Sequence, residues 1–235
     1  MTGVESIRDN AARVLDRIAR AAERSGRKGQ AIRLIAVGKT QPVEFIGEAL
    51  EAGLAVFGEN YVQEAEGKIR AFPQAEWHLI GKLQRNKVKK AVSLFSFIQT
   101  VDSLGLLAEI SRRAGEAGKV MPVLVEVNLA GEGSKAGVAP EEVTGLLEAA
   151  PGLPGISLRG LMAIPPWTED PEESRPYFIR LREMFSDCVS RGGAEPGMTE
   201  LSMGMSNDFE AAIEEGATMV RVGTAIFGSR ARRGA

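Results

Sequence analysis

The chain has 235 residues, 44% of them hydrophobic, which is enough to bury one large core or two small ones. Its 29 Lys and Arg residues nearly balance 31 Asp and Glu residues, and the formal charge is -2. This balance argues against general nucleic-acid binding, which usually requires a marked basic excess. A single cysteine, Cys188, excludes an intrachain disulfide and favours a reducing compartment. No apolar run approaches the ~20 residues of a membrane-spanning helix, and the N-terminus lacks a secretory pattern, so we expect a cytoplasmic protein without a membrane role.

The first expected element is an N-terminal helix within residues 1–25. Thr2 and Glu5 have the spacing of a capping box, in which two side chains satisfy N–H groups of the first turn. Four apolar residues are expected on one face of this helix: Ile7, Val14, Leu15 and Ile18.

Beyond residue 30, short apolar runs alternate with amphipathic stretches. The apolar runs predict eight strands, at 32–38, 54–57, 77–80, 95–99, 120–127, 156–161, 199–202 and 218–222. The stretches between them predict helices, at 43–50, from 60, around 88–92, at 103–117, from 140, from 170 and at 209–213. The helix from 170 carries four apolar residues on one side: Phe178, Leu181, Phe185 and Val189.

Alternating strands and helices indicate a parallel sheet. About eight such repeats within roughly 200–250 residues predict a closed (β/α)8 barrel, the TIM-barrel fold. An open doubly wound sheet is the alternative, but no G-x-G-x-x-G opens a helix after the first strand. We find no linker or low-complexity segment, so we expect one domain over residues 1–235, with the barrel at 31–228.

Polar residues gather at the predicted carboxyl ends of the strands, where barrels bind ligands. The residues at these ends are Lys39, Glu59, Asn60, His78, Asp102, Asn128, Ser202, Ser206, Arg221 and Thr224. Closure of the barrel places the first strand beside the eighth. We therefore expect Lys39 to face the turn that begins at Arg221, although the two are far apart in the sequence.

Two late turns have the character of anion sites. Gly204 permits a tight turn, and Ser206 offers a hydroxyl next to the N–H groups that open a helix. Gly223 and Thr224 add amides and a second hydroxyl after the eighth strand. Barrels often hold phosphate at these two places, so an amine and a phosphate cradle together suit a phosphorylated aldehyde. The alternative is that Ser206 or its neighbour only caps the helix.

Arg221 alternates with Met219 and so points to the same side of the eighth strand. A guanidinium inside the barrel needs a partner. An inward carboxylate such as Glu126 is one possible partner, and the ring nitrogen of a pyridoxal cofactor is the other. The residues alone leave both open.

Other polar groups are assigned structural roles. We expect His78, the chain's one histidine, to be a core residue that supports the site rather than a catalyst. A basic cluster is expected to be a solvated helix face rather than an RNA or phosphate site: Lys82, Arg85, Lys87, Lys89 and Lys90. Cys188 is expected to be a small apolar filler. No Cys, His and carboxylate set has metal-ligand spacing, so no metal is expected.

Taken together, the motifs resemble the pyridoxal-phosphate-binding YggS/PROSC family, also called the PLP homeostasis proteins. The matching blocks lie at 35–40 (IAVGKT), 57–64 (FGENYVQE), 77–81 (WHLIG), 83–87 (LQRNK), 160–162 (GLM), 201–208 (LSMGMSND) and 221–228 (RVGTAIFG). Two departures are Gly38, where the family more often has Ser, and the Gly81–Lys82 pair before Leu83. Neither departure touches the lysine or the phosphate turns.

The resemblance implies a barrel like the N-terminal domain of alanine racemase, with pyridoxal 5'-phosphate (PLP) held by Lys39 as an internal aldimine. It implies a role in PLP supply without robust turnover, a monomer, and apo PLP-dependent enzymes as possible partners. The cofactor-binding residues that it implies are Lys39, Asn60, Met162, Ser202, Met203, Ser206, Arg221, Gly223 and Thr224.

Two enzymatic readings are the alternatives. A racemase-like enzyme would use the same lysine and arginine, but the chain ends at Ala235, without the β-rich second domain of alanine racemase. The second acid–base group of alanine racemase is a tyrosine that the partner subunit delivers. The only tyrosines of the present chain are Tyr61 and Tyr177, so the racemase interpretation lacks this second group. A Schiff-base aldolase would also use a lysine and a phosphate site, but it explains a lysine on the first strand less well.

Overall fold

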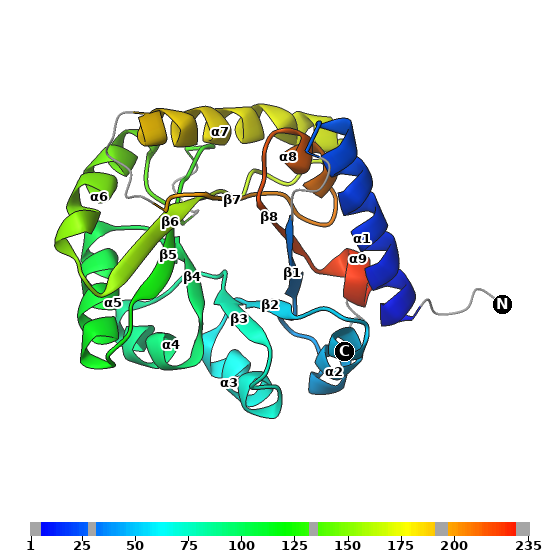
Figure 1. Cartoon of the computed structure of the whole chain (residues 1–235), viewed down its shortest axis with the longest axis horizontal. Coiled ribbons are helices and arrows are strands. Elements are labelled where there is room, and N and C mark those ends of the chain that lie inside the picture. Colours follow the sequence, from blue (N-terminus) through cyan, green and yellow to red (C-terminus); the bar gives the residue numbers. More distant parts are fainter. Residues whose placement is uncertain (1–5, 28–31, 132–135, 191–196, 229–235) are drawn as a thin grey trace.

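The computed structural model describes residues 6–27, 32–131, 136–190 and 197–228. Eight parallel strands form a closed barrel in sequence order (Figure 1). The strands are β1 (Arg33–Val37), β2 (Val56–Glu59), β3 (Glu76–Leu79), β4 (Phe97–Val101), β5 (Met121–Glu126), β6 (Ile156–Met162), β7 (Glu200–Ser202) and β8 (Met219–Val222). Strand β1 pairs with β8, with Ile35 beside Arg221 and Ala36 beside Val222. The predicted (β/α)8 barrel is therefore confirmed.

Helices surround the barrel on its outside (Figure 1). They are α1 (Ile7–Arg24), α2 (Val43–Glu51), α3 (Val62–Ala71), α4 (Val88–Leu94), α5 (Leu104–Glu116), α6 (Val143–Ala149), α7 (Arg175–Ser190), α8 (Phe209–Glu214) and α9 (Thr224–Phe227). Short 3-10 turns add η1 (Arg85–Lys87), η2 (Pro140–Glu142), η3 (Ala150–Gly152) and η4 (Pro171–Ser174). Among the described residues, no helix has the length and apolar character needed to cross a membrane.

Two strands begin two residues later than the apolar runs predict. Leu54 and Phe95 are buried as expected, but the N–H of Leu54 donates to Ala49 and the N–H of Phe95 donates to Ala91. These bonds satisfy carbonyl groups at the ends of α2 and α4. The apolar residue therefore closes the preceding helix, and the strand starts after it.

The apolar core has two parts. A small group fills the barrel interior: Ile35, Phe97, Leu124, Met162 and Met219. A much larger group packs between the strands and the helices. The barrel interior therefore contains an apolar layer below the carboxyl ends of the strands. Polar side chains of the interior lie between this layer and the strand ends.

Helix α1 begins after Ser6, whose hydroxyl accepts from the N–H of Asp9. The predicted capping box lies in residues 1–5, outside the described part of the chain. Of the four residues expected on one face, Ile7, Val14 and Ile18 are buried, whereas Leu15 is 44% exposed. At 3.6 residues per turn Leu15 lies about 80° around the helix from Ile7, at the edge of the buried face. The helix packs beside α8 and α9, where Asn10 donates to the carbonyl of Ile226 at 2.9 Å (Figure 1).

Helix α7 is buried at its start and exposed at its end. Phe178 and Leu181 are buried and Phe185 is half-buried, but Val189 is 46% exposed. Because burial falls steadily along one face, the helix leaves the core towards its C-terminus, and periodicity alone does not reveal this.

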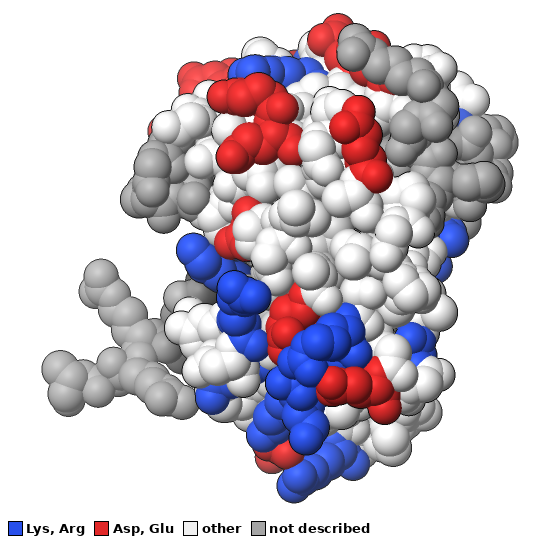
Figure 2. Space-filling model, turned by 90° about the vertical axis from the view of Figure 1, so that its left-hand side faces the viewer, with Lys and Arg blue, Asp and Glu red and all other residues white. Residues whose placement is uncertain are grey.

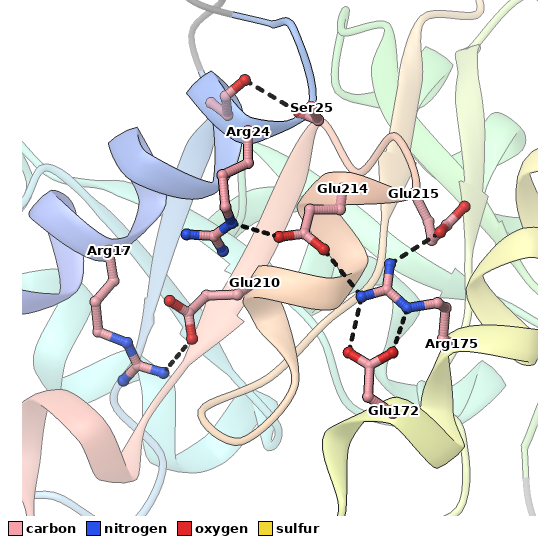
Figure 3. A network of polar contacts seen from close by, with 9 residues as sticks. Arg17, Arg24, Ser25, Glu172, Arg175, Glu210, Glu214 and Glu215 are labelled. Carbon is pink, nitrogen blue, oxygen red and sulfur yellow. Dashed lines mark hydrogen bonds and ion pairs between the residues drawn. The ribbon is translucent and has the colours of Figure 1, made fainter.

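An ion-pair network joins α1, α8 and the start of α7 (Figure 3). Arg24 contacts Glu214 at 2.8 Å, and Glu214 also accepts from Arg175 at 2.9 Å. Arg175 further contacts Glu172 at 2.6 Å and Glu215 at 2.9 Å. A shared network of this kind stabilises more than isolated surface pairs do, and it fastens the N-terminal helix over the junction of β8 and β1.

The predicted basic cluster lies largely in solvent. Lys82, Arg85 and Lys89 are exposed, and Lys90 pairs with Glu66 of α3. Figure 2 shows the side of the molecule that lies at the left of Figure 1. On this face most basic side chains lie towards the lower end and most acidic ones towards the upper end, and each end carries charges of both signs.

Candidate functional site

A cavity of about 350 Å³ opens at the carboxyl ends of β1 and β8. Six of the predicted site residues line it: Lys39, Asn60, Ser206, Arg221, Gly223 and Thr224. The first strand and the last strand contribute to the same wall, as closure of the barrel requires. Lys39 and the two late turns, which are far apart in the sequence, therefore line one cavity.

Lys39 lies in a tight turn directly after β1. The N–H of Gln41 donates to the carbonyl of Gly38 at 3.0 Å, which closes the turn, and Thr40 has a φ of 61°. A β-branched residue is strained in this left-handed conformation, at a cost of about 1–3 kcal/mol. Glu64 compensates in part, since its carboxylate accepts from the N–H of Thr40 at 2.5 Å.

The buried Lys68 of α3 stabilises this turn through hydrogen bonds. The Lys68 ammonium donates to the carbonyl of Gly38 at 2.7 Å, to Glu64 at 2.8 Å and to Glu59 at 2.9 Å. Burial raises the pKa of Glu59 to about 7, although the hydrogen bond from Lys68 acts against this shift. A Cβ at Gly38 would lie 2.9 Å from a Glu59 oxygen, so the network also restricts the residue before Lys39. The backbone that carries the Lys39 amine is therefore held rigidly.

Arg221 is held by a second polar network inside the barrel. Its guanidinium donates to the Ser202 hydroxyl at 2.7 Å and to the carbonyl of Ala163 at 2.9 Å. Burial lowers the pKa of Arg221 to about 10, so the group still carries its charge at neutral pH. Glu126, the expected carboxylate partner, makes no hydrogen bond with it and acts only through its charge.

Ser202 continues this network across the barrel. Its hydroxyl donates to Gln99 Oε1 at 2.7 Å, and Gln99 Nε2 lies 2.8 Å from His78 Nδ1. His78 Nε2 lies 2.8 Å from Glu76 Oε1 at the start of β3. Burial lowers the pKa of His78, which keeps the ring neutral. Because an amide N–H can only donate, Nδ1 accepts and Nε2 carries the ring proton. Every donor therefore points the same way, from the Arg221 cation to the Glu76 carboxylate.

The two late turns are joined by one hydroxyl. Ser206 Oγ accepts from the N–H of Gly223 at 3.1 Å and from that of Ala225 at 3.3 Å. The capping alternative for Ser206 is wrong, because the N-cap of α8 is Asp208, whose carboxylate accepts from the N–H of Met205 at 2.6 Å. Both turns line the cavity that Lys39 lines.

Three implied cofactor-binding residues do not line the cavity. Met162 belongs to the apolar group in the barrel interior, and Met203 is fully buried in the outer core. Ser202 is fully buried beneath Arg221. Any effect of these side chains on a ligand acts through neighbouring residues.

Several residues of the site carry no clear sequence signal. The loop after β6 contributes Ile164, Trp167 and Thr168 to the cavity wall, and Trp167 is 77% exposed.

Two other residues had a partial sequence signal. Gln99 is an isolated polar residue that alternates with the inward-facing Phe97 of the same strand. Lys68 lies four residues after Glu64, which predicts the helical pair but not the contact with the turn.

The fold matches a known class of barrel. The chain matches the family model described as "Alanine racemase, N-terminal domain" over residues 10–231. Alanine racemase of Clostridium difficile 630 shares the fold with a TM-score of 0.73 at 17% identity, covering 96% of this chain and 58% of that one. The molecule is therefore a barrel of the alanine racemase N-terminal class.

More similar relatives narrow this class. Proteins named pyridoxal phosphate homeostasis protein are 46% identical in Aquifex aeolicus (strain VF5), over 93% of this chain and 96% of the relative, and 43% identical in Pseudomonas aeruginosa, over 97% of each. PipY of Synechococcus elongatus PCC7942, solved with PLP bound, has a TM-score of 0.79 at 38% identity, covering 90% of this chain and all of that one. The chain belongs to the pyridoxal phosphate homeostasis protein family, as its motifs indicated.

Removing the centre of the polar network tests its contribution. Gln99→Leu removes the acceptor of the Ser202 hydroxyl proton and the donor to His78 Nδ1, so the free energy of unfolding should fall by about 2–4 kcal/mol. Chemical denaturation measures this, with the exposed Gln63→Leu as a matched control. Adding Ser202→Ala to Gln99→Leu should cost less than the sum of the single changes, because the two residues share one bond. Strict additivity would show that the network is not coupled.

Proposed function

We propose that the protein holds PLP in the 350 Å³ cavity as a Schiff base on Lys39 and serves cytoplasmic PLP supply without robust turnover. The observation that carries the proposal is that a lysine, a buried guanidinium and two hydroxyl-bearing turns line one cavity. The names of the relatives, and PipY with PLP bound, support the same cofactor for this chain.

Each part of the cavity suits one part of the cofactor. PLP supplies an aldehyde that condenses with a primary amine, and Lys39 is the amine in the cavity wall. Ser206 and Thr224 offer hydroxyl donors for the phosphate. The Gly223 N–H, which donates to Ser206 Oγ in this structure, lies beside them and would turn to the phosphate when the cofactor is bound. Arg221 offers N–H donors to the pyridine nitrogen.

The remaining implied residues have supporting parts in the proposal. Asn60 lines the cavity at the end of β2 and offers an amide to the ring substituents. Ser202 acts through Arg221, and Met162 and Met203 pack beneath the site.

A holding role fits the protonation of the site better than rapid catalysis. Arg221 keeps its proton at neutral pH, so it leaves the pyridine nitrogen unprotonated and weakens the cofactor as an electron sink. The racemase alternative also needs a second acid–base group. Neither tyrosine lines the cavity, and Tyr61 is largely exposed. We therefore favour a monomeric carrier that passes PLP to apo enzymes over a racemase-like enzyme.

Replacing Lys39 tests the covalent attachment. Lys39→Ala should purify without a visible aldimine band, because no amine remains at the cofactor's aldehyde, while its circular dichroism spectrum stays that of wild type. Lys82→Ala, which removes a lysine from a neighbouring cavity, should keep the band. A normal band in Lys39→Ala would show that another lysine binds PLP.

Replacing the turn hydroxyls tests the phosphate site. Thr224→Ala should weaken PLP binding by about 1–3 kcal/mol through loss of a charge-assisted hydrogen bond. Ser206→Ala should do the same, with an added loss of the bonds that join the turns. Fluorescence titration with PLP and with pyridoxal separates the effects, since pyridoxal has no phosphate. Equal losses for both ligands would assign the turns a structural role only.

Exchange of α-protons separates a carrier from an enzyme. The loaded protein should reactivate apo PLP enzymes, but it should exchange the α-protons of a panel of amino acids with deuterated water slowly or not at all, as followed by NMR. Lys39-dependent exchange near the enzyme median of ~10 s⁻¹ for any amino acid would contradict the carrier role.

A further inference from the structure

A second cavity of about 230 Å³ lies beside the one described above, and the two share Asn60, Ile80 and Ile164 in their walls. The rest of its wall comes from the loop after β3 and from the end of β5: Gly81, Lys82, Glu126, Val127, Asn128 and Ala136. Its volume is below the 300–1,000 Å³ typical of pockets for drug-sized ligands. A ligand of a few heavy atoms is therefore the expected size.

Glu126 is the unusual residue of this wall. Its side chain is only 6% exposed, and its Oε2 atom has no hydrogen-bond partner in the described part of the chain. An unpartnered buried carboxyl is unfavourable for folding. Arg221 does not relieve it, because the guanidinium donates to Ser202 and to the carbonyl of Ala163 instead. One oxygen of this carboxyl therefore lacks a structural partner, and the carboxyl that carries it lines the cavity wall.

The charges around Glu126 come from three elements. Burial raises the pKa of Glu126 to about 7, and Asp102 at the end of β4 acts in the same direction. Arg221 of β8 and Lys82 of the β3 loop act against it. Lys82 is at the mouth of the cavity, with its side chain 68% exposed and its ammonium 4.0 Å from Asp102, the limit of an ion pair. The cavity thus has a buried acid at one side and an available cation at its mouth.

We infer that this second cavity is a binding subsite for a free α-amino acid with a small apolar side chain, whose ammonium group binds Glu126 and whose carboxylate binds Lys82. A zwitterion matches both charges. The apolar walls formed by Ile80, Val127 and Ile164 suit a short aliphatic side chain. A lysine side chain of a client protein has an ammonium group but no carboxylate, so it could bind Glu126 but not Lys82.

The inference rests on the proposed function in one respect, namely that PLP occupies the adjoining cavity. An amino acid in the subsite would then lie next to the cofactor, at the walls shared through Asn60, Ile80 and Ile164. The protein would bind a primary amine beside the aldehyde that it stores, which ties PLP holding to amino-acid supply.

Calorimetric titration of L-alanine tests the subsite. The PLP-loaded protein is first reduced with borohydride, which fixes the cofactor and prevents exchange with the added amine. L-alanine should bind saturably and at least tenfold more tightly than ethylamine or propionate, each of which carries one of its two charges. Glu126→Gln should weaken L-alanine binding at least tenfold, and Lys82→Met at least threefold. Glu51→Gln, an exposed change at the end of α2, should have no effect.

The variant Glu126→Gln should also fold well. Glu126 has a pKa raised above its unfolded value, so the charged form destabilises the fold as pH rises through about 7. Removing the charge should therefore raise the Tm at pH 8 more than at pH 5, and PLP affinity should stay within twofold of wild type.

Three results would overturn the inference. The first is the absence of saturable L-alanine binding to the wild type. The second is binding of L-alanine to Glu126→Gln with wild-type affinity. The third is ethylamine binding as tightly as L-alanine, which would exclude the amino-acid assignment. If the wild-type protein takes up no PLP, the proposed function fails instead, and the titration of the unloaded protein still decides the subsite.

Discussion

A charged guanidinium inside the barrel is the constraint on which the site depends. Arg221 is almost fully buried and still protonated at neutral pH, so it needs acceptors that the apolar interior does not offer. Ser202 and the carbonyl of Ala163 supply them. Ser202 in turn requires Gln99, Gln99 requires His78, and the series ends at a carboxylate. One buried cation therefore determines the residue type at the inward positions of three other strands.

All hydrogen bonds from Arg221 to Glu76 run in one direction, and this common direction fixes the position of the Arg221 guanidinium. Each group donates to the next, so every link polarises its neighbour. A change of tautomer at His78 would leave an N–H facing the N–H of Gln99. Neutral His78, fixed by burial, is consequently as much a part of Arg221's placement as the Ser202 hydroxyl is.

The amine and the guanidinium are held by different means. Arg221 projects from a strand and is held through its side chain, whereas Lys39 lies in a strained turn and is held through its backbone. Lys68 and Glu64 bond to the backbone of the residues on either side of Lys39, so the position of its Cα is fixed. A lysine whose backbone is fixed in this way suits the proposed attachment of PLP at one place in the cavity.

The sequence predicts the barrel, its strand order and the convergence of Lys39 with the late turns, because these follow from alternation and closure. The start of β2 and of β4 was not predictable from hydrophobicity, since Leu54 and Phe95 are as apolar as strand residues but complete helix ends. The role of Ser202 was missed for a different reason. Its contacts depend on which inward residues of non-neighbouring strands meet at one level of the barrel, and no local pattern encodes that. Lys68 was missed likewise, since its partner is a backbone carbonyl 30 residues earlier.

The placement of the two tryptophans has a practical consequence. Trp77 is buried between the barrel and its helices, whereas Trp167 stands in solvent at the edge of the cavity. Emission from the two indoles should therefore differ in wavelength, with the blue-shifted component following the integrity of the core and the red-shifted component following events at the cavity mouth. A single emission spectrum can thus report folding and occupancy separately, without an added label.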